Sequence, residues 1–381
     1  MKLLKLAFIL FLPLLNLRED PNNSISHNLI TGAVDPVKIG LLIPDNKSLT
    51  AVRAAEIAVN KANQSGGLKG RPFKIVVRSL EGPWGTGSKQ AVDLIFNEKV
   101  WALMGSHDGR NAHLVEQAAT KATVVFLSGW AGDPSLSQAF VPWFFNCVHN
   151  DAQQVAAIIS NTLDNNQIKK ITIVKDDDDY DSRVSFAAFE KASDEKGKTK
   201  LIVLPCKTYI SDLNSLIEKI KESEPDYVLL FCRPEISAGI LMQMKMQKMN
   251  KNVAGPIYIM NEDIIPPDKL KQLDNFFLIP SDKFDVSAFM QFKAEYEKKY
   301  GALPGLVASY AFDGINVLIE AIKKAGSPER EKIQKALFET DYMGITGRIR
   351  FDERGNRKGN LHLARIVNGT PALFSDRSPT E

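Results

Sequence analysis

Short apolar runs alternate along the chain with longer stretches in which apolar residues recur every three or four positions. Residues 37–43 form the first run and residues 50–64 the first amphipathic stretch, which stops at Gly66 and Gly67. An unbroken apolar run predicts a buried strand, the longer spacing predicts a helix, and glycine marks the end of that helix. The same reasoning predicts strands at 73–79, 100–106 and 122–129 and helices at 88–98 and 112–121.

The alternation begins again after residue 150. Helices are expected at 151–163, 182–197, 211–223 and 236–249, and strands at 169–175, 200–205, 225–232 and 255–260. Strands that alternate with helices need crossover connections, which build parallel sheets covered by helices on both faces. The fold class is therefore α/β, with one parallel sheet in each half of the chain.

The last part of the chain breaks this order. Two long amphipathic helices are expected at 287–301 and 306–326, and residues 344–369 predict two strands joined by a turn at 353–359. A hairpin so far along the chain from the other strands indicates that the chain changes domain more than once.

The first residues carry the pattern of an export signal. Lys2 and Lys5 precede an apolar run over 3–17, and a charged triplet ends that run. The run is shorter than the ~20 residues that a spanning helix needs. We expect a signal peptide over 1–18, a flexible lead-in over 19–36 and a periplasmic location. Because no small-x-small cleavage triplet follows, an uncleaved N-terminal anchor is the alternative.

Composition narrows the range of partners. A chain of 381 residues is long enough for two domains. Its net charge is +3 with both signs interspersed, so it offers no basic face to nucleic acid. Nucleic acid is therefore excluded as a partner.

Two features that suggest metal chemistry do not fit it. The cysteines Cys147, Cys206 and Cys232 are odd in number and widely spaced, which predicts buried thiols instead of a disulfide framework or a zinc site. The four aspartates at 176–179 lack the Gly and Glu that a calcium loop of the EF-hand type requires at its sixth and twelfth positions. We expect a solvated turn there, and no metal.

Enzymatic motifs are missing from the sequence. It contains no G-x-S-x-G elbow, no H-E-x-x-H pair and no phosphate-binding loop, and its five histidines are not spaced as metal ligands. We therefore expect no enzyme, no catalytic residues and no cofactor.

The loops after the predicted strands carry the candidate binding residues, because ligands of open parallel sheets bind beyond the carboxyl ends of the strands. The side chains of interest there are Trp84, His107, Asp108, Trp130, Tyr180, Arg233 and Glu262. Two aromatic platforms with a few charges suit a small zwitterion or amide. The helices that follow the loops at 105–111 and 128–135 would also direct unpaired N–H groups toward a ligand carboxylate.

Four segments of the sequence are specific enough to compare with known families. They are VKIGLLIP, RAAEIAVNKANQSGGLKGRPFKIVV with its Gly-Gly-Leu-x-Gly turn, IVKDDDDYDSRV and FDERGNRKG. These segments resemble the type I periplasmic binding proteins, in particular the branched-chain amino-acid-binding (Leu/Ile/Val) group of ABC transporters. The resemblance extends from Val37 to Leu373.

The resemblance implies two Rossmann-like lobes that close as a hinge on the ligand, connected by three crossing segments. These crossings are expected near 147–150, 279–283 and 341–344. The N-terminal lobe would then contain residues 37–147 and 283–341, and the C-terminal lobe residues 151–280 and 344–373.

The resemblance also implies positions for first-lobe binding residues. The hydroxyl-bearing loop of the family corresponds to the segment around Asp108, and its small-residue loop to Ser128, Ala131 and Gly132. We expect main-chain N–H groups between Ser128 and Gly132 to hold an anionic end of the ligand. Where the family offers hydroxyl side chains to an amino-acid carboxylate, this chain has Gly109 and Gly132.

The remaining roles fall on the second lobe and on the tryptophans. Glu262 corresponds to the carboxylate that takes the ammonium group of the ligand, and Tyr180 to an aromatic residue that closes over it. Arg233 stands near a family aromatic and is a candidate partner for the ligand carboxylate. Trp130, in place of a family alanine, and Trp84 are expected to stack on the ligand.

The expected function is that of an extracytoplasmic solute-binding protein. It would close on a small polar ligand, an amino acid or a related amide or amine, and act as a monomer that delivers the ligand to the permease subunits of an ABC transporter. The alternative is a ligand-sensing receptor module of the same fold that takes no part in transport. A relic of the fold that has lost its ligand is a third hypothesis.

Overall fold

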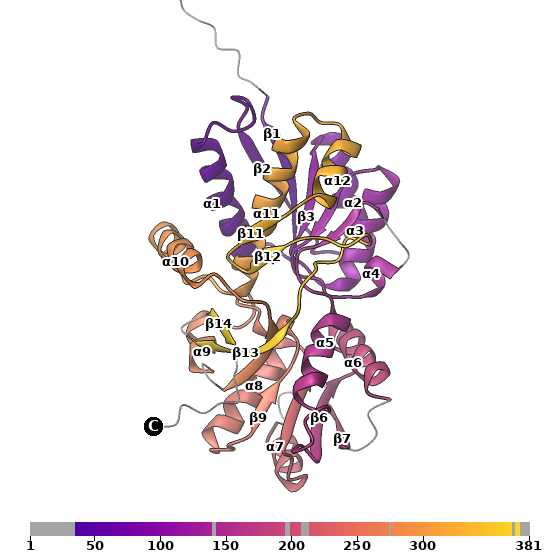
Figure 1. Cartoon of the computed structure of the whole chain (residues 1–381), viewed down its shortest axis with the longest axis vertical. Helices are drawn as coiled ribbons and strands as arrows, with labels where there is room; N and C mark the ends of the chain where they lie inside the picture. Colours follow the sequence, from indigo (N-terminus) through magenta and orange to yellow (C-terminus); the bar gives the residue numbers. More distant parts are fainter. Residues whose placement is uncertain are drawn as a thin grey trace, which may run out of the picture. The chain divides into compact units, whose positions relative to one another are not determined.

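The structure is a computed structural model that describes residues 35–138, 142–194, 199–206, 213–273, 276–367 and 370–373. The expected signal peptide and all but the last two residues of the expected lead-in lie outside the described residues. Figure 1 shows the arrangement of the described helices and strands.

The first sheet has five strands, all parallel, in the order β2-β1-β3-β4-β5. Its strands are β1 (Val37–Ile43), β2 (Phe73–Ser79), β3 (Ala102–Gly105), β4 (Phe126–Ser128) and β5 (Phe144–Asn146). The connecting helices are α1 (Thr50–Gln64), α2 (Thr86–Val92) with its π-helical continuation η1 (Asp93–Asn97), α3 (Gly109–Lys121) and α4 (Ser135–Gln138).

Three helices from much later in the sequence follow the second sheet along the chain. They are α10 (Val286–Tyr300), α11 (Leu306–Ala325) and α12 (Arg330–Phe338). The buried helix α11 packs along α1 and also contacts β3 and β4 (Figure 1). The chain therefore returns to the five-stranded sheet after it has built most of the second sheet, and we call the first sheet with these helices the first lobe.

The second sheet has seven strands in the order β14-β13-β10-β9-β8-β6-β7. Its strands are β6 (Lys170–Asp176), β7 (Lys200–Cys206), β8 (Tyr227–Phe231), β9 (Asn252–Ala254), β10 (Phe277–Ser281), β13 (His362–Val367) and β14 (Thr370–Leu373). Pairing is parallel from β7 to β10, whereas β13 and β14 form an antiparallel edge.

The helices between these strands complete the second lobe. They are α5 (Asp151–Asn161), α6 (Tyr180–Ser193), α7 (Leu213–Glu222), α8 (Pro234–Met246), the 3-10 turn η3 (Ile257–Met260) and α9 (Pro267–Gln272). Two lobes, each with a sheet that is mostly or wholly parallel, confirm the expected α/β fold class.

Local sequence explains where the helices begin and end. Asn150 and Gln153 form a reciprocal capping box at the start of α5, which satisfies N–H groups that the helix itself cannot pair. At the other end, α10 and α11 stop at Gly301 and Gly326, whose φ angles of 62° and 66° lie in the left-handed region that glycine adopts at low cost.

One predicted strand was wrong, and other strands were not predicted. Residues 255–260 were expected to form a strand, but β9 ends at Ala254 and Ile257–Met260 is a 3-10 turn. Pro256 starts that turn and has no N–H group to donate to a sheet. The three-residue strand β5 was not predicted, because three apolar residues are too few for a periodicity.

The predicted C-terminal hairpin is also paired differently. The strand β12 (Gly347–Ile349) pairs with β11 (Tyr342–Gly344) in a separate two-stranded sheet, and β13 pairs with β10 and β14. The expected turn at 353–359 is closed by a single bridge between Phe351 and Arg357. Its two sides therefore belong to different sheets.

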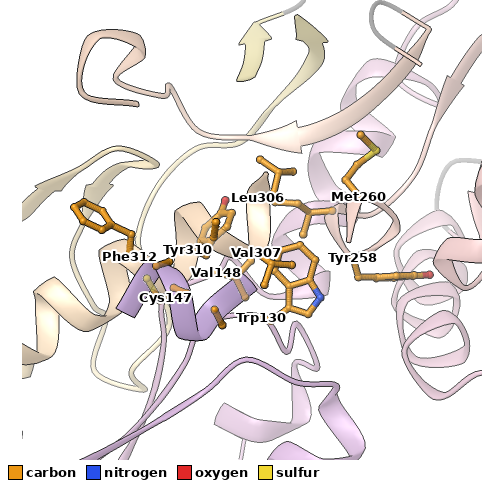
Figure 2. Packing of buried hydrophobic residues seen from close by; sticks show 14 of the residues in the cluster. Trp130, Cys147, Val148, Tyr258, Met260, Leu306, Val307, Tyr310 and Phe312 are labelled. Carbon is orange, nitrogen blue, oxygen red and sulfur yellow. The ribbon is translucent and has the colours of Figure 1, made fainter. Parts of the chain in front are cut away.

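One hydrophobic cluster extends through both lobes. It contains core residues of the first sheet such as Ile39 and core residues of the second such as Leu230. Figure 2 shows part of this cluster, which includes Trp130, Val148, Val307 and Tyr258. The contact between the lobes is therefore largely apolar at its centre.

Three further observations concern the cysteines, metal binding and membrane spans. All three cysteines are buried and none forms a disulfide, which confirms the expected thiols. Among the described residues there is no group of three or more His, Cys, Asp or Glu side chains that could hold a metal ion. In the same part of the chain, no helix is both long enough and apolar enough to cross a membrane.

Candidate functional site

The loops at the carboxyl ends of the two sheets meet through direct side-chain contacts. We call this region the lobe interface and define it by the segments that make the contacts. They are residues 108–109, 130–133, 180–181, 258–263 and 305–308, together with Thr50 at the start of α1 and Asp151 at the start of α5.

Tyr180 and Asp133 join the lobes through a short hydrogen bond. The Tyr180 hydroxyl donates to Asp133 Oδ2 over 2.7 Å, and His113 Nε2 lies 3.0 Å from the same oxygen. Hydrogen bonds to Asp133 and Glu116 raise the pKa of His113 to about 9. Burial alone would raise the pKa of Asp133, but hydrogen bonds from His113, Ser135 and Tyr180 lower it to about 2. Asp133 is thus an anion at neutral pH, and His113 is its cation.

A second link between the lobes lies at the start of α3. Asp108 caps this helix by accepting a hydrogen bond from the N–H of Asn111 at 2.8 Å. The N–H of Gly109 instead donates across the interface to Asp181 Oδ1 at 3.0 Å. A Cβ atom on Gly109 would lie 3.0 Å from that oxygen and 3.2 Å from the Tyr180 ring. The glycine therefore lets the opposite lobe approach this helix closely.

Gly132 has a similar role beside Asp151. The N–H of Asp151 donates to the Gly132 carbonyl at 2.6 Å, and a Cβ on Gly132 would lie 2.2 Å from Asp151 Oδ1. Burial raises the pKa of Asp151 to about 7. A family hydroxyl residue could not replace Gly132 here unless Asp151 moved away.

The loop after β4 is held by its own hydrogen bonds. Ser128 Oγ accepts from the Ala131 N–H at 3.1 Å, and Asn146 Nδ2 donates to the Ala131 carbonyl at 3.0 Å. Trp130 is 5% exposed and packs edge to face with Tyr310, with ring centroids 6.3 Å apart. The indole of Trp130 is thus buried at the interface and removed from water, which stabilises this contact between the lobes.

Glu262 reaches from the second lobe to the start of α11. Its carboxylate accepts hydrogen bonds from the N–H groups of Gly305, Val307 and Ala308 at 3.0, 2.9 and 2.8 Å. Burial raises the pKa of Glu262 to about 7 despite these bonds. A Cβ on Gly305 would lie 2.7 Å from the Glu262 carboxyl carbon, so this glycine is part of the same contact.

The next residue makes a parallel contact. Asp263 Oδ1 accepts from the N–H of Thr50 at 3.1 Å and also from the Thr50 hydroxyl, at the first residue of α1. Burial raises the pKa of Asp263. Two consecutive carboxylates of the second lobe therefore each end at the start of a first-lobe helix.

Three candidate residues lie away from this interface or are already engaged. The guanidinium of Arg233 pairs with Asp176 through Nε and Nη2, at 2.6 and 3.2 Å. His107 is buried against Phe126, and burial lowers its pKa. Trp84 is 68% exposed and lies under the Arg110 guanidinium, 4.4 Å from the ring centroid.

The structure thus brings together Asp108, Trp130, Gly132, Tyr180 and Glu262, with Ser128 and Ala131 shaping the loop that carries Trp130. Sequence reasoning missed Asp133, Asp151 and Asp181. Asp133 stands in an Asp-Pro-Ser helix-start pattern that could have been recognised as a cap.

The aspartate run at 176–179 has two distinct ends. Asp179 caps α6 by accepting from the Ser182 N–H at 2.9 Å, as expected of a residue before a helix. Asp176, in contrast, is fully buried and paired with Arg233 instead of being solvated. The sequence pattern could not reveal this partner, which is 57 residues away.

The chain has two α/β lobes, and the loops at the strand ends of the two lobes meet at one interface. This arrangement defines the class of two-lobed, type I binding proteins. Residues 36–371 match the family described as "Periplasmic binding protein", and the chain belongs to that family. This confirms the resemblance seen in the sequence. The family consists of extracytoplasmic solute-binding proteins, not of enzymes.

Individual relatives are distant but cover most of the chain. The chain is 22% identical over 342 residues to a leucine-, isoleucine-, valine-, threonine- and alanine-binding protein of Pseudomonas aeruginosa, which covers 86% of this chain and 88% of that protein. It is also 23% identical to glutamate receptor 3.4 of Arabidopsis thaliana, over 84% of this chain but only 37% of the receptor.

Solved structures share the fold. The isoleucine complex of the branched-chain amino acid transporter substrate-binding protein LivJ from Streptococcus pneumoniae superposes with a TM-score of 0.75 at 20% identity, covering 88% of this chain and 98% of that one. A solute-binding protein of Rhodopseudomonas palustris in complex with 3,4-dihydroxybenzoic acid gives a TM-score of 0.73 at 21% identity, covering 88% and 95%. At such identities the fold is shared, while the bound ligands differ.

Proposed function

We propose that the chain is a solute-binding protein that closes on a small polar ligand, an amino acid or a related amide or amine, and delivers it to the permease subunits of an ABC transporter. The observation that carries this proposal is the lobe interface. There Tyr180 of the second lobe meets Asp133 of the first, Glu262 reaches the start of α11, and Trp130 belongs to the hydrophobic cluster that both lobes share. Aromatic faces and carboxylates together suit the cationic end of such a ligand. No catalytic activity is part of this proposal.

The roles within the site follow the contacts. Trp130 and Tyr180 would contact the ligand, and Glu262 would take its ammonium group after leaving α11. The loop from Ser128 to Gly132 would offer main-chain groups. Arg233 has no part in this proposal, because Asp176 already uses its guanidinium.

We further propose that the lobes move about three crossings. The first lies at 147–150, as the resemblance implied. The second lies at 282–285, slightly later than the expected 279–283, because Ser281 still belongs to β10. The third lies at 357–361, later than the sequence suggested, because residues 345–356 still contact first-lobe elements. Asp313 of α11 accepts from the N–H of Thr346, and the Asn146 N–H in β5 donates to the Gly355 carbonyl.

Export to the periplasm as a monomer belongs to the same proposal. The expected signal at the start of the chain and the family membership support it. A receptor module that senses the ligand without transport is the second candidate, favoured by the similarity to glutamate receptor 3.4 over 84% of this chain. Mass spectrometry of the exported protein tests the anchor that a sensor would use, because a transport protein with a cleaved signal lacks the first residues.

A ligand screen by thermal shift tests the function itself. A compound at a hundred times its dissociation constant stabilises the folded protein by ~2.7 kcal/mol. With the best compound, Trp130→Ala should lose affinity, whereas Trp84→Ala, which changes an exposed tryptophan, should not. Equal affinity of the wild type and Trp130→Ala would refute the site. A screen of amino acids, amides and amines without any stabilising compound would refute the ligand class.

A further inference from the structure

The solvent face of α2 and its continuation η1 carries large apolar side chains. On the opposite face, Ala91 and Leu94 turn toward the first sheet and share a hydrophobic cluster with Val76 of β2. On the solvent face, Val92 is 45% exposed and Phe96 is 58% exposed. The helix lies on the side of the sheet away from α1 and α11 (Figure 1). The first lobe therefore has an apolar outer face where a surface helix usually presents polar residues.

Trp84 extends this face at the start of α2. It stands in the loop after β2, is 68% exposed, and lies under the Arg110 guanidinium. Gly82 and Gly85 on either side have φ angles of 148° and 95°, which glycine adopts at low cost and which turn the loop outward. Phe96 follows twelve residues after Trp84, which corresponds to ~18 Å along a helix. We call this surface the α2 ridge and define it by Trp84, Lys89, Val92, Phe96 and Lys99.

The α2 ridge has an excess of positive charge. Lys89 and Lys99 are both exposed, and in the described part of the chain neither has a carboxylate within ion-pair distance. Lys89 stands on the same helix face as Val92 and Phe96, three and seven positions before them. The apolar side chains of the ridge are therefore interleaved with cations.

The acidic side chains beside the ridge are balanced by other cations. Asp93 and Glu98 pair with Arg78 at 2.8 and 2.9 Å, and Glu98 also pairs with Lys38 at 3.0 Å. Glu81, in the loop of Trp84, is the exposed acid at that end, where the Arg110 guanidinium offsets it. The two ridge lysines thus remain as the uncompensated charge.

We propose that the α2 ridge docks on the anionic headgroups of a phospholipid bilayer. Tryptophan and phenylalanine side chains favour the boundary between headgroups and acyl chains, and lysines beside them meet the lipid phosphates. Each lysine near such a surface strengthens binding about fivefold. The ridge protrudes from the lobe, and a bilayer adapts to a protruding surface, whereas a protein partner would need a matching groove. This docking is independent of any ligand between the lobes.

Flotation with lipid vesicles tests the docking. The protein is made as residues 35–381, which contain every described element and form one compact unit, so the apolar run at 3–17 cannot contribute. It should float with vesicles of phosphatidylcholine and phosphatidylglycerol but not with phosphatidylcholine alone, and added salt should weaken binding. Since the other tryptophans are buried or half-buried, the fluorescence of Trp84 should shift to shorter wavelength on binding, and Trp84→Phe should lose that shift.

Matched variants isolate the ridge from the rest of the surface. The ridge variant combines Lys89→Ala, Val92→Ser and Phe96→Ser, and should lose more than about tenfold in affinity for the anionic vesicles. The control removes an exposed lysine and two exposed apolar side chains from α10 of the same lobe, by Lys298→Ala, Val286→Ser and Met290→Ser, and should bind as the wild type does. If the ridge variant fails to fold, the charge reversal Lys89→Glu with Lys99→Glu decides, because neither lysine is packed.

Several outcomes would overturn the proposal. They are no flotation of the wild type with anionic vesicles, equal flotation with neutral vesicles, and equal binding by the ridge variant and the α10 control. A dimer in sedimentation equilibrium that the ridge variant abolishes would also overturn it, because the ridge would then belong to an interface with a second copy of the chain. Thermal-shift binding of a small ligand should be unchanged in the ridge variant, so these results do not bear on the proposed function.

Discussion

The fully buried Arg357 lies close to all three of the proposed crossings between the lobes. Its Nη1 donates to the Cys147 carbonyl and to Thr346 Oγ1, both at 3.0 Å, and its Nη2 donates to the Thr346 carbonyl at 2.7 Å. The Asp282 carboxylate lies 3.8 Å away, and the Tyr310 ring faces the guanidinium at 5.9 Å. One side chain therefore links residues near all three proposed crossings.

Replacing Arg357 with methionine keeps much of the volume but removes the donors. Two buried main-chain carbonyls, of Cys147 and Thr346, then lose this partner, at about 1–3 kcal/mol each. Methionine returns part of that loss through apolar packing. We expect the free energy of unfolding to fall by about 3 kcal/mol.

Urea denaturation followed by circular dichroism measures this loss. An unchanged slope of the unfolding free energy against urea concentration would show that wild type and variant expose the same surface on unfolding. Arg348→Met is the control, because Arg348 pairs with Asp341 on the surface, where screening by water leaves such a pair weak. A loss for Arg357→Met no larger than that of the control would refute the linking role of Arg357.

Three further predictions address the lobe interface. Trp130→Ala should cost about 3–5 kcal/mol in denaturation experiments, because it empties a buried site; a loss below that of the exposed Trp84→Ala would contradict this. Gly132→Ala should also destabilise the protein, by about 1–3 kcal/mol, since its Cβ would lie 2.2 Å from Asp151; a neutral effect would show that Asp151 moves freely. Glu262 has a pKa of 4.5 in the unfolded chain and about 7 in the folded protein, so folding favours its protonated form. The resulting stabilisation is complete below pH 4.5 and should disappear as the pH rises to about 7. The difference in unfolding free energy between wild type and Glu262→Gln, measured across that range, should therefore fall and then level off; a constant difference would contradict burial of the acid.

Sequence periodicity predicted most of the two sheets, because long buried strands such as β1 and β6 and their crossover helices have a strong local pattern. It failed where pairing depends on distant partners. The strands β11 and β12 are three residues each, and nothing in 344–369 tells which earlier strand β13 will join. The position of β13 between β10 and β14 is set by the packing of the whole lobe.

The candidate site was predicted in part for the same reason. Loops at the ends of parallel strands are readily found, so Asp108, Trp130 and Tyr180 were identified. What each side chain touches was not, since Arg233 and Asp176 are far apart in sequence, as are Glu262 and α11. The glycines that differ from the family pattern make sense only in three dimensions, as space for Asp181 and Asp151.

The order of strands and helices along the chain also affects how the protein can be made. The first lobe lacks α11 until residues 306–325 have been synthesised. The second sheet lacks β13 and β14, which pair beyond β10, until residues 362–373 have been synthesised. A ribosome that has released only the first half of the chain therefore holds neither lobe in finished form. Such a nascent chain keeps apolar surfaces exposed that chaperones can bind.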